Sequence, residues 1–190
     1  PILYEAPLML EKSNFSEVVC RELNLKSNPP ELTEWTEMVE KIKNRPYSVN
    51  IGLVGKYTEL HDAYLSVAEA LRHAGYIYNT HIKINWIDSE KLNDSNANEI
   101  LSGLHGIIVP GGFGDRGIEG MICAAKYARE NNIPYFGICL GMQIAVIEFA
   151  RNVLGISDAN SGEFDEACPN KVIDFMPGQS DEVDKGGTLR

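Results

Sequence analysis

The sequence predicts an α/β fold, with an open, mostly parallel sheet that carries helices on both faces. From Tyr47 onward, short runs rich in β-branched residues alternate with longer segments of helical spacing, as in parallel sheets with crossover helices. The run 106–109 is apolar throughout, which is typical of a strand buried on both faces. Glycine-rich turns follow Val109 and Ile138, and such sheets bind ligands at the carboxyl ends of their strands.

The elements of this domain follow one another along the chain. Strand patterns are found at 48–55, 82–87, 106–109 and 133–138. Helical patterns are found at 62–75, where a glycine is expected to end the helix, and at 93–101, 120–132 and 141–154. Beyond them the chain is polar and rich in turns over 158–168, a short strand is predicted at 171–175, and an acidic, flexible stretch is predicted at 177–187.

Residues 1–47 differ in character from the rest. Prolines punctuate 1–8, which predicts an extended entry, and helical spacing is found at 15–23 and 33–43. No residue in this segment belongs to a pattern that indicates chemistry. We therefore predict an arm over 1–47, which docks on or links to another domain, and an α/β domain over 48–190.

Composition excludes several classes of function. The chain has 190 residues, and 27 acidic against 17 basic residues give a net charge of −10, which disfavours binding to nucleic-acid phosphates. No apolar run reaches the length needed to span a membrane. The four cysteines are far apart, which indicates a reducing compartment rather than a disulfide framework or a zinc site. We expect a cytoplasmic protein.

Cys139 lies at the apex of a predicted strand–turn–helix. Gly137 and Gly141 flank it, and Gly-x-Cys-x-Gly is the thiol version of the nucleophile elbow. So tight a turn requires glycines, because a Cβ would strike neighbouring backbone. The helix that follows places unpaired N–H groups and a partial positive charge beside the sulfur, which favours the reactive thiolate. A buried packing cysteine is the alternative, and the glycine spacing favours a nucleophile.

The loop Pro110–Gly114 directly follows the buried strand. Its glycines leave backbone N–H groups free to point at a substrate oxygen, as an oxyanion hole does. By itself, Gly-Gly-x-Gly is also compatible with a phosphate-binding loop or a plain turn, although it lacks the Lys-Ser/Thr ending of a P-loop. Together with a cysteine elbow on the next strand, it indicates acyl transfer.

Acyl transfer at a cysteine also requires a base. The four histidines all precede Cys139, and they are His61, His73, His81 and His105. They lie at loop edges, near a helix end or just before a strand, and each is interpreted as a surface residue. The residues therefore indicate a nucleophile and oxyanion donors but identify no base.

These motifs resemble those of the triad-type glutamine amidotransferases and, within them, the glutaminase domain of the CTP synthase family. The resemblance rests on the elbow 137–143 and on the loop 110–114 with its continuation to Gly120. Further segments that resemble this family lie along almost the whole chain, at 4–8, 32–35, 55–66, 158–164 and 186–190.

The resemblance implies a flavodoxin-like amidotransferase domain, preceded by the segment that joins it to a synthase domain. Such a domain hydrolyses glutamine through a γ-glutamyl thioester, and the ammonia aminates UTP to CTP. By position, the resemblance assigns the nucleophile to Cys139 and the carboxylate that receives the α-ammonium group of glutamine to Glu163. It assigns the oxyanion and glutamine contacts to Gly112, Leu140, Gly141, Met142 and Gln143.

The same resemblance implies cofactors and partners. It implies no cofactor and no metal in this domain, Mg and ATP in the synthase domain, and GTP as an allosteric activator whose effector region includes Arg116 and Glu119. The implied partners are L-glutamine and the protein's own synthase domain with UTP and ATP, in a homotetramer, without nucleic acid or membrane.

Two departures from the family pattern change what we expect. Gly162 stands where the family usually has Thr, which is expected to loosen the loop that carries Glu163. The family's catalytic His-x-Glu lies beyond Arg190, so residues 1–190 are expected to form an incomplete domain with very weak or no glutamine turnover. Two alternatives remain, a glutaminase domain of another amidotransferase and a catalytically idle binding module.

Overall fold

The computed structural model describes residues 2–175, and the chain divides into two compact units. The first comprises Pro1–Ser48 and Arg72–His81, and the second comprises Val49–Leu71 and Ile82–Arg190. The predicted acidic stretch at 177–187 and the motif at 186–190 lie outside the described residues.

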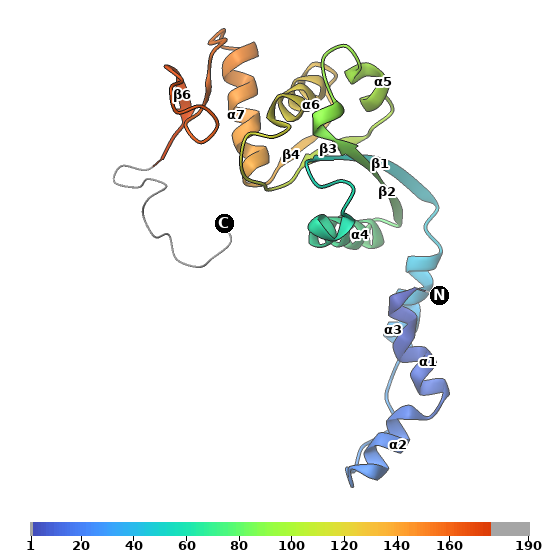
Figure 1. Cartoon of the computed structure of the whole chain (residues 1–190). Helices are drawn as coiled ribbons and strands as arrows, with labels where there is room; N and C mark the ends of the chain where they lie inside the picture. The colour runs from blue at the N-terminus through green and yellow to red at the C-terminus, as the bar shows by residue number, and fades with distance from the viewer. Residues whose placement is uncertain (1, 176–190) are drawn as a thin grey trace. The chain divides into compact units, whose positions relative to one another are not determined.

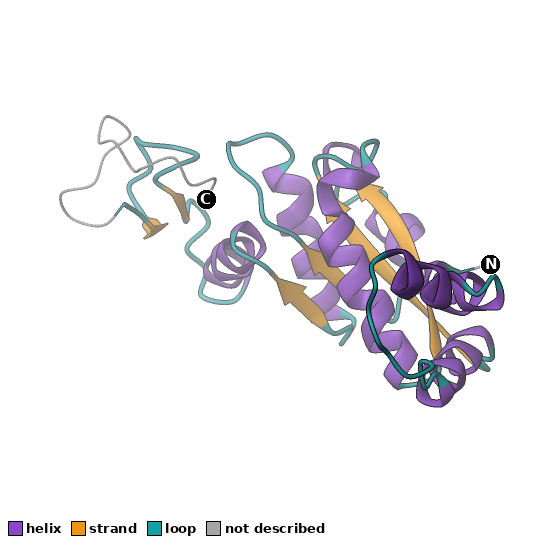
Figure 2. Cartoon of the chain, turned by 90° about the horizontal axis from the view of Figure 1, so that it is seen from below, coloured by secondary structure: helices purple, strands orange, loops and turns teal. Residues whose placement is uncertain are grey.

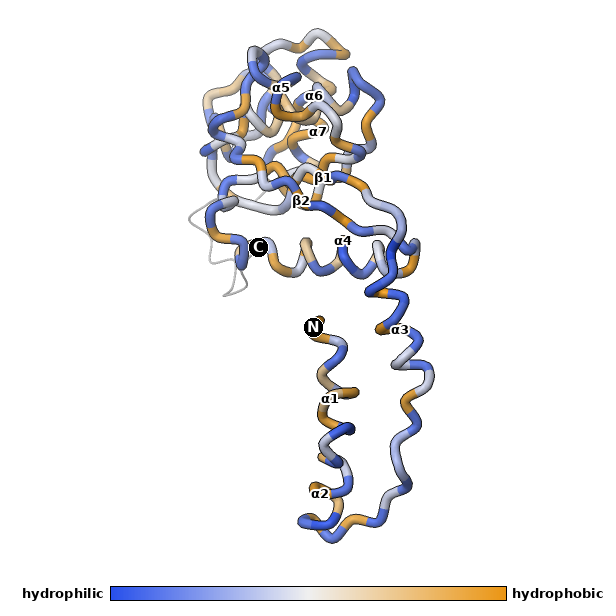
Figure 3. The backbone as a smooth tube through the Cα atoms, turned by 90° about the vertical axis from the view of Figure 1, so that its right-hand side faces the viewer, coloured by the Kyte–Doolittle hydropathy of each residue, from blue (hydrophilic) through white to orange (hydrophobic). Residues whose placement is uncertain are grey.

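The N-terminal segment of the first unit is helical. Its elements are η1 (Leu3–Glu5), α1 (Ala6–Lys12), α2 (Phe15–Glu22) and α3 (Thr33–Lys43), and hydrophobic residues recur at intervals along them (Figure 3). The predicted extended entry over 1–8 is therefore wrong. Pro7 lies in the first turn of α1, where a helix has no acceptor for a backbone N–H and proline is tolerated.

The sheet has the strand order β2-β1-β3-β4. The strands are β1 (Tyr47–Gly55), β2 (Thr80–Asp88), β3 (Gly106–Val109) and β4 (Tyr135–Gly137), drawn in orange in Figure 2. The pairs β1–β3 and β3–β4 are parallel. Val109 lies opposite Gly137, so the two glycine-rich turns leave the same edge of the sheet from adjacent strands.

Helices connect these strands. They are η2 (His61–Tyr64), α4 (Leu65–Ile77), η3 (Ser89–Lys91), α5 (Ala97–Leu101), α6 (Ile118–Glu130) and α7 (Leu140–Asn152), followed by the short strands β5 (Asn160–Ser161) and β6 (Lys171–Ile173). The prediction that Gly75 ends this helix is wrong, since α4 continues past it to Ile77. The helix predicted from residue 93 begins only at Ala97, because the Asn93 side chain accepts from the backbone N–H of Ser95 and forms a turn.

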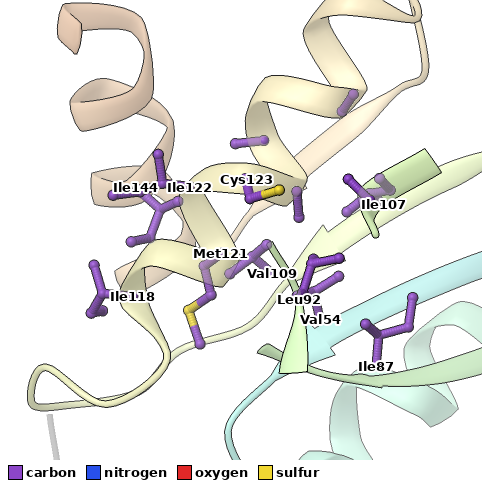
Figure 4. Close-up of a cluster of buried hydrophobic side chains, with 14 of the residues drawn as sticks. Val54, Ile87, Leu92, Ile107, Val109, Ile118, Met121, Ile122, Cys123 and Ile144 are labelled. Atoms are coloured by element: carbon purple, nitrogen blue, oxygen red, sulfur yellow. The ribbon is translucent and has the colours of Figure 1, made fainter. Parts of the chain in front are cut away.

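Alternate residues of the strands bury opposite faces of the sheet. Ile107 and Val109 point into a cluster with α5, α6 and α7, which Figure 4 shows from within. Ile108 packs on the other face, where Tyr64 and the first turns of α4 cover the sheet. Figure 1 shows α4 on one side of the strands and α5–α7 on the other. The predicted fold class, a parallel sheet with helices on both faces, is confirmed.

A partly buried ion pair joins α6 to α7. The Arg129 guanidinium donates to both carboxylate oxygens of Glu148, at 2.8–3.2 Å, and only 4% of the Glu148 side chain is exposed. A bidentate pair of this kind imposes a geometry as well as an attraction. It therefore helps to set the position of α7, the helix that begins just after Cys139.

Candidate active site

Cys139 is exposed and occupies a backbone conformation that side chains rarely adopt. It is the N-cap of α7, with φ 51° and ψ −103°. Such a conformation costs about 1–3 kcal/mol and persists only where its surroundings impose it. Here the N–H of Ile138 donates to the Val109 carbonyl at 2.9 Å, and the N–H of Gly141 closes the turn on the Ile138 carbonyl at 2.9 Å. The strain is therefore imposed by the backbone on either side of the cysteine.

The two glycines of the elbow are required by packing. A Cβ on Gly137 would lie 2.3 Å from the carbonyl carbon and oxygen of Gly141, and one on Gly141 would lie 2.1 Å from the Val109 carbonyl oxygen. Both neighbours are backbone atoms, which cannot move aside as a flexible side chain can. The Tyr135 hydroxyl donates to the Gly141 carbonyl at 2.8 Å and adds a further restraint. The steric expectation from the sequence is met at both positions.

The loop 110–114 packs against this elbow. A Cβ on Gly111 would lie 3.6 Å from Cβ of Cys139, and one on Gly112 would lie 3.2 Å from a methyl carbon of Leu140. Within residues 2–175, the N–H groups of Gly112 and Leu140 have no acceptor. Backbone N–H groups without partners, beside a nucleophile, are the elements of an oxyanion hole.

Glu163 reaches the same loop from the segment after α7. Its carboxylate accepts a hydrogen bond from the N–H of Gly114 at 3.0 Å. The Ser161 hydroxyl accepts from the N–H of Glu163 at 3.2 Å, and Ser161 is 1% exposed. A Cβ on Gly162 would lie 2.3 Å from a carboxylate oxygen of Asp174. The N–H of Gly162 donates to the Ile173 carbonyl. The described loop is thus tied to its neighbours on both sides of Gly162.

The first turn of α7 presents its residues in different ways. Leu140 and Gly141 are buried, so that only their backbone can serve a ligand, whereas Met142 is 51% exposed. The side-chain oxygen Oε1 of Gln143 is buried and has no hydrogen-bond partner within the described residues. Burying an acceptor without a hydrogen-bond partner costs free energy, so this oxygen is a candidate to accept a hydrogen bond from a donor group on a ligand.

Arg116 and Glu119, predicted as an effector region, have separate partners. Arg116 forms an ion pair with Glu90 and donates to the Lys56 carbonyl at 3.3 Å. Glu119 accepts two hydrogen bonds from Arg151, at 2.9 and 3.0 Å. Arg116 lies in the segment that follows the loop 110–114, and Glu119 lies in the first turn of α6.

All four histidines are exposed, as predicted from the sequence. His81 is the second residue of β2 and is exposed. His61 stacks on Trp86 at 4.2 Å between centroids, His73 hydrogen-bonds Tyr4 at 2.6 Å, and His105 accepts from the N–H of Asn50 at 3.0 Å. None of these contacts involves Cys139.

Sequence reasoning missed the side chains that hold the site. Lys56 donates to the loop 110–114, Tyr64 accepts a hydrogen bond from the backbone N–H of Lys56, and Tyr135 donates to the elbow. Lys56 carried the only usable signal, because a lysine directly after an apolar strand lies at the ligand-binding edge of a parallel sheet. Among the described residues, no group of three or more His, Cys, Asp or Glu side chains is arranged to hold a metal ion, and no helix has the length and apolarity to cross a membrane.

Comparison with known proteins decides the family. The sequence profile described as "Glutamine amidotransferase class-I" matches residues 59–189. The chain belongs to the class-I glutamine amidotransferase family. This amidotransferase chain is 58% identical over 189 residues to a CTP synthase of Ruminiclostridium cellulolyticum and 54% identical over 188 residues to that of Bacillus subtilis. These alignments cover 100% and 99% of the chain and 35% of each relative, so the chain spans about a third of their length.

A solved structure also resembles this amidotransferase. It is described as the Trypanosoma brucei CTPS glutaminase domain with bound acivicin, and it is 46% identical in sequence. The match has a TM-score of 0.65 and covers 70% of this chain and 52% of that one. The predicted resemblance to triad-type glutamine amidotransferases is confirmed.

Proposed function

We propose that this chain is the glutaminase part of a CTP synthase, which hydrolyses glutamine at Cys139 and supplies ammonia for the amination of UTP to CTP. The similarity to CTP synthases along essentially the whole chain supports the choice of enzyme. The observation that carries the chemistry is the exposed, strained Cys139 beside the unpartnered N–H groups of Gly112 and Leu140.

The proposed reaction uses these groups in order. The Cys139 thiolate attacks the side-chain carbonyl carbon of glutamine, forming a C–S bond while the carbonyl oxygen becomes an oxyanion. The N–H groups of Gly112 and Leu140 stabilise that oxyanion. Collapse of the intermediate breaks the C–N bond and releases ammonia after protonation, leaving a γ-glutamyl thioester. Water then attacks the thioester and releases glutamate and the thiol.

Substrate positioning falls to neighbours of these groups. The Glu163 carboxylate is proposed to receive the α-ammonium group of glutamine, since it lies beside the loop 110–114 and accepts a hydrogen bond from the N–H of Gly114. The Gln143 oxygen and the backbone of Leu140, Gly141 and Met142 are proposed to contact the rest of the substrate. We propose that Arg116 and Glu119 belong to the region through which GTP acts.

The remaining proposals concern the whole protein. Residues 1–47 would form the arm that connects to a synthase domain, with the amidotransferase domain over 48–190. That synthase domain would bind Mg, ATP and UTP, in a cytoplasmic homotetramer, and this domain would need no cofactor of its own. All four cysteines are free, in keeping with a reducing compartment. The general base is proposed to lie in a His-x-Glu motif outside residues 1–190.

The test uses the protein at its natural full length and substitutes Cys139→Ala. We expect loss of glutamine hydrolysis and of glutamine-dependent CTP formation by at least ~10³-fold, while CTP formation from added ammonia is retained. Cys20→Ala, at a half-buried cysteine of the first unit, is the matched control and should leave both activities unchanged.

Other outcomes point to the alternatives. Glutamate release by the unsubstituted protein without amination of UTP would favour another amidotransferase. Absence of glutamate release, with Cys139 intact and the protein folded, would favour an idle binding module and overturn the proposal.

A further inference from the structure

Lys56 is a buried cation that the chemistry at Cys139 does not use. It follows β1 directly, is 5% exposed, and its amine donates to the carbonyls of Phe113 at 2.7 Å and Gly114 at 2.5 Å. Both carbonyls belong to the loop 110–114, which carries the proposed oxyanion donor of Gly112 and is called the oxyanion loop below. A protonated lysine has three donors, so the loop satisfies two of them. The side chain thus ends on the backbone of the loop rather than on a carboxylate.

The contacts at Phe113 and Gly114 restrain a single peptide unit from both ends. Lys56 holds the carbonyl oxygen of Phe113, and Glu163 holds the N–H of Gly114, at 3.0 Å. These groups belong to the same peptide plane, in which oxygen and hydrogen point in opposite directions. With both ends held, rotation of this plane is restrained. The N–H of Gly112 belongs to the peptide of Gly111 and Gly112, two planes earlier in the same short loop. The stem of Lys56 also lies beside Gly112, because a Cβ there would be 3.9 Å from the lysine Cε.

Lys56 is itself held by its backbone. Its N–H donates to the Tyr64 hydroxyl at 3.1 Å, and its carbonyl accepts from Arg116 at 3.3 Å. Tyr64 is 4% exposed, and its hydroxyl approaches so closely that a Cβ on Gly55 would lie 2.6 Å from it. The backbone of Lys56 is therefore held by hydrogen bonds at both its N–H and its carbonyl. Its side chain reaches a loop, 111–114, for which no backbone–backbone hydrogen bond is found among the described residues.

The position of this amine is costly for the folded state. Burial lowers the pKa of Lys56, and the Arg116 guanidinium nearby lowers the pKa further, whereas the carboxylates of Glu163, Asp115 and Glu90 act in the opposite direction. A group that folding holds in an unfavourable environment is commonly one that function requires.

We propose that Lys56 is a positioning residue that orients the oxyanion loop for acyl transfer at Cys139. The proposal rests on the proposed glutaminase function, and it assigns to Lys56 no contact with substrate. Lys56 restrains the loop by holding the carbonyls of Phe113 and Gly114 and by packing its stem beside Gly112. Its loss therefore loosens the loop that carries the Gly112 N–H, a donor that serves only the tetrahedral intermediate.

The test compares three variants in the protein at its natural full length. Lys56→Met keeps the length of the side chain and removes the donors, and Lys56→Arg restores donors. Lys126→Met is the matched control, because Lys126 is also hydrogen-bonded and partly buried, but its partner is Asp94. Two reactions are followed for each variant, the hydrolysis of glutamine and the alkylation of Cys139 by iodoacetamide, which displaces iodide and forms no oxyanion.

We expect Lys56→Met to lower kcat for glutamine hydrolysis by about 10- to 100-fold, below the ~10²–10³ lost when an oxyanion donor is removed outright. KM should change by less than about threefold, because the donor acts in the transition state. Alkylation of Cys139 should stay within about twofold of the parent, and Lys56→Arg should recover part of kcat.

Three outcomes would overturn the inference. Unchanged kcat in Lys56→Met would show that the loop does not depend on this amine. Equal losses of hydrolysis and of alkylation would show a general structural role. Absence of glutamate release by the unsubstituted protein, with Cys139 still alkylated, would overturn the proposed function and with it a role of Lys56 in acyl transfer.

Discussion

The elbow at 137–141 and the loop at 110–114 both follow parallel strands and both depend on glycine, yet they are held in different ways. In the elbow, the neighbours of Gly137 and Gly141 are backbone atoms of the turn itself and of the adjacent strand. The loop has room at two of its three glycines: the nearest atom to a Cβ on Gly111 would be 3.6 Å away, and nothing lies within 4 Å of one on Gly114. Only Gly112 is close to a neighbour, and that neighbour is a side-chain methyl carbon, 3.2 Å away on Leu140. The shape of the loop depends on Lys56 and Glu163, which are distant in sequence.

This difference separates two kinds of restraint in one site. The proposed nucleophile, Cys139, is placed by a tight turn of consecutive residues that packs on the backbone of the adjacent strand. The loop that carries Gly112, the proposed oxyanion donor, is held by side chains that reach it from other parts of the fold. Substitutions in the elbow should therefore damage the fold, whereas substitutions around the loop should change kinetics first.

The largest effect is expected for Gly141→Ala. The added methyl would meet the Val109 carbonyl at 2.1 Å, so the strand and helix must separate, at a cost of about 3 kcal/mol or more. Glutamine hydrolysis should fall by at least ~10²-fold, because a displacement of about 1 Å can have that effect. Chemical denaturation and glutamate release measure the two losses. Gly103→Ala is the control, because it has positive φ (77°) but open space, and equal losses in both variants would refute the packing argument.

A smaller effect, on substrate binding, is expected for Glu163→Gln. The amide oxygen can still accept from the N–H of Gly114, but the charge that receives the α-ammonium group is lost. KM for glutamine should rise by about tenfold with little change in kcat. Glu166→Gln, at an exposed acid on the same segment, should leave KM unchanged. A fall in kcat at constant KM would instead assign Glu163 to the loop alone.

Gly114→Ala should have a moderate effect on the loop. Its φ of 73° disfavours any side chain by about 1 kcal/mol, although no neighbour blocks a methyl group. If that cost falls on the active shape of the loop, kcat should drop by about fivefold with normal folding. A loss as large as that of Gly141→Ala would remove the distinction between the two turns.

The smallest effect concerns stability. Since the pKa of Lys56 is lowered in the folded state, the unfolded chain binds more protons there, and this residue's contribution to stability rises with pH up to the ordinary lysine range. Lys56→Met should therefore be at least as stable as the parent at neutral pH, and its advantage should shrink as the pH rises through the lowered pKa. Thermal unfolding measured from pH 7 upward tests the sign. A variant that is less stable at neutral pH would contradict it.

Several features could be predicted from local sequence. The alternation of short apolar runs with helical segments indicated the parallel sheet, because periodicity reflects which face of an element is buried. The elbow was recognisable because its Gly-x-Cys-x-Gly pattern lies within five consecutive residues, although Val109 and Tyr135 also restrain it from outside them. Local patterns were wrong at Pro7, which lies in the first turn of a helix where proline is tolerated, and at Asn93, whose side chain forms a turn.

The sequence by itself determined the class of fold, the nucleophile candidate and the glycine loop, since each depends on residues close together in the chain. Only the tertiary structure decided that Lys56 and Glu163 meet on one peptide of that loop, which lies 57 and 49 residues away from them. The hydrophobic periodicity of the sequence cannot predict these contacts, because they depend on how three strands and a later segment pack together. The candidate nucleophile is thus recognisable from local sequence, whereas the geometry of the proposed oxyanion donors depends on the packing of the whole domain.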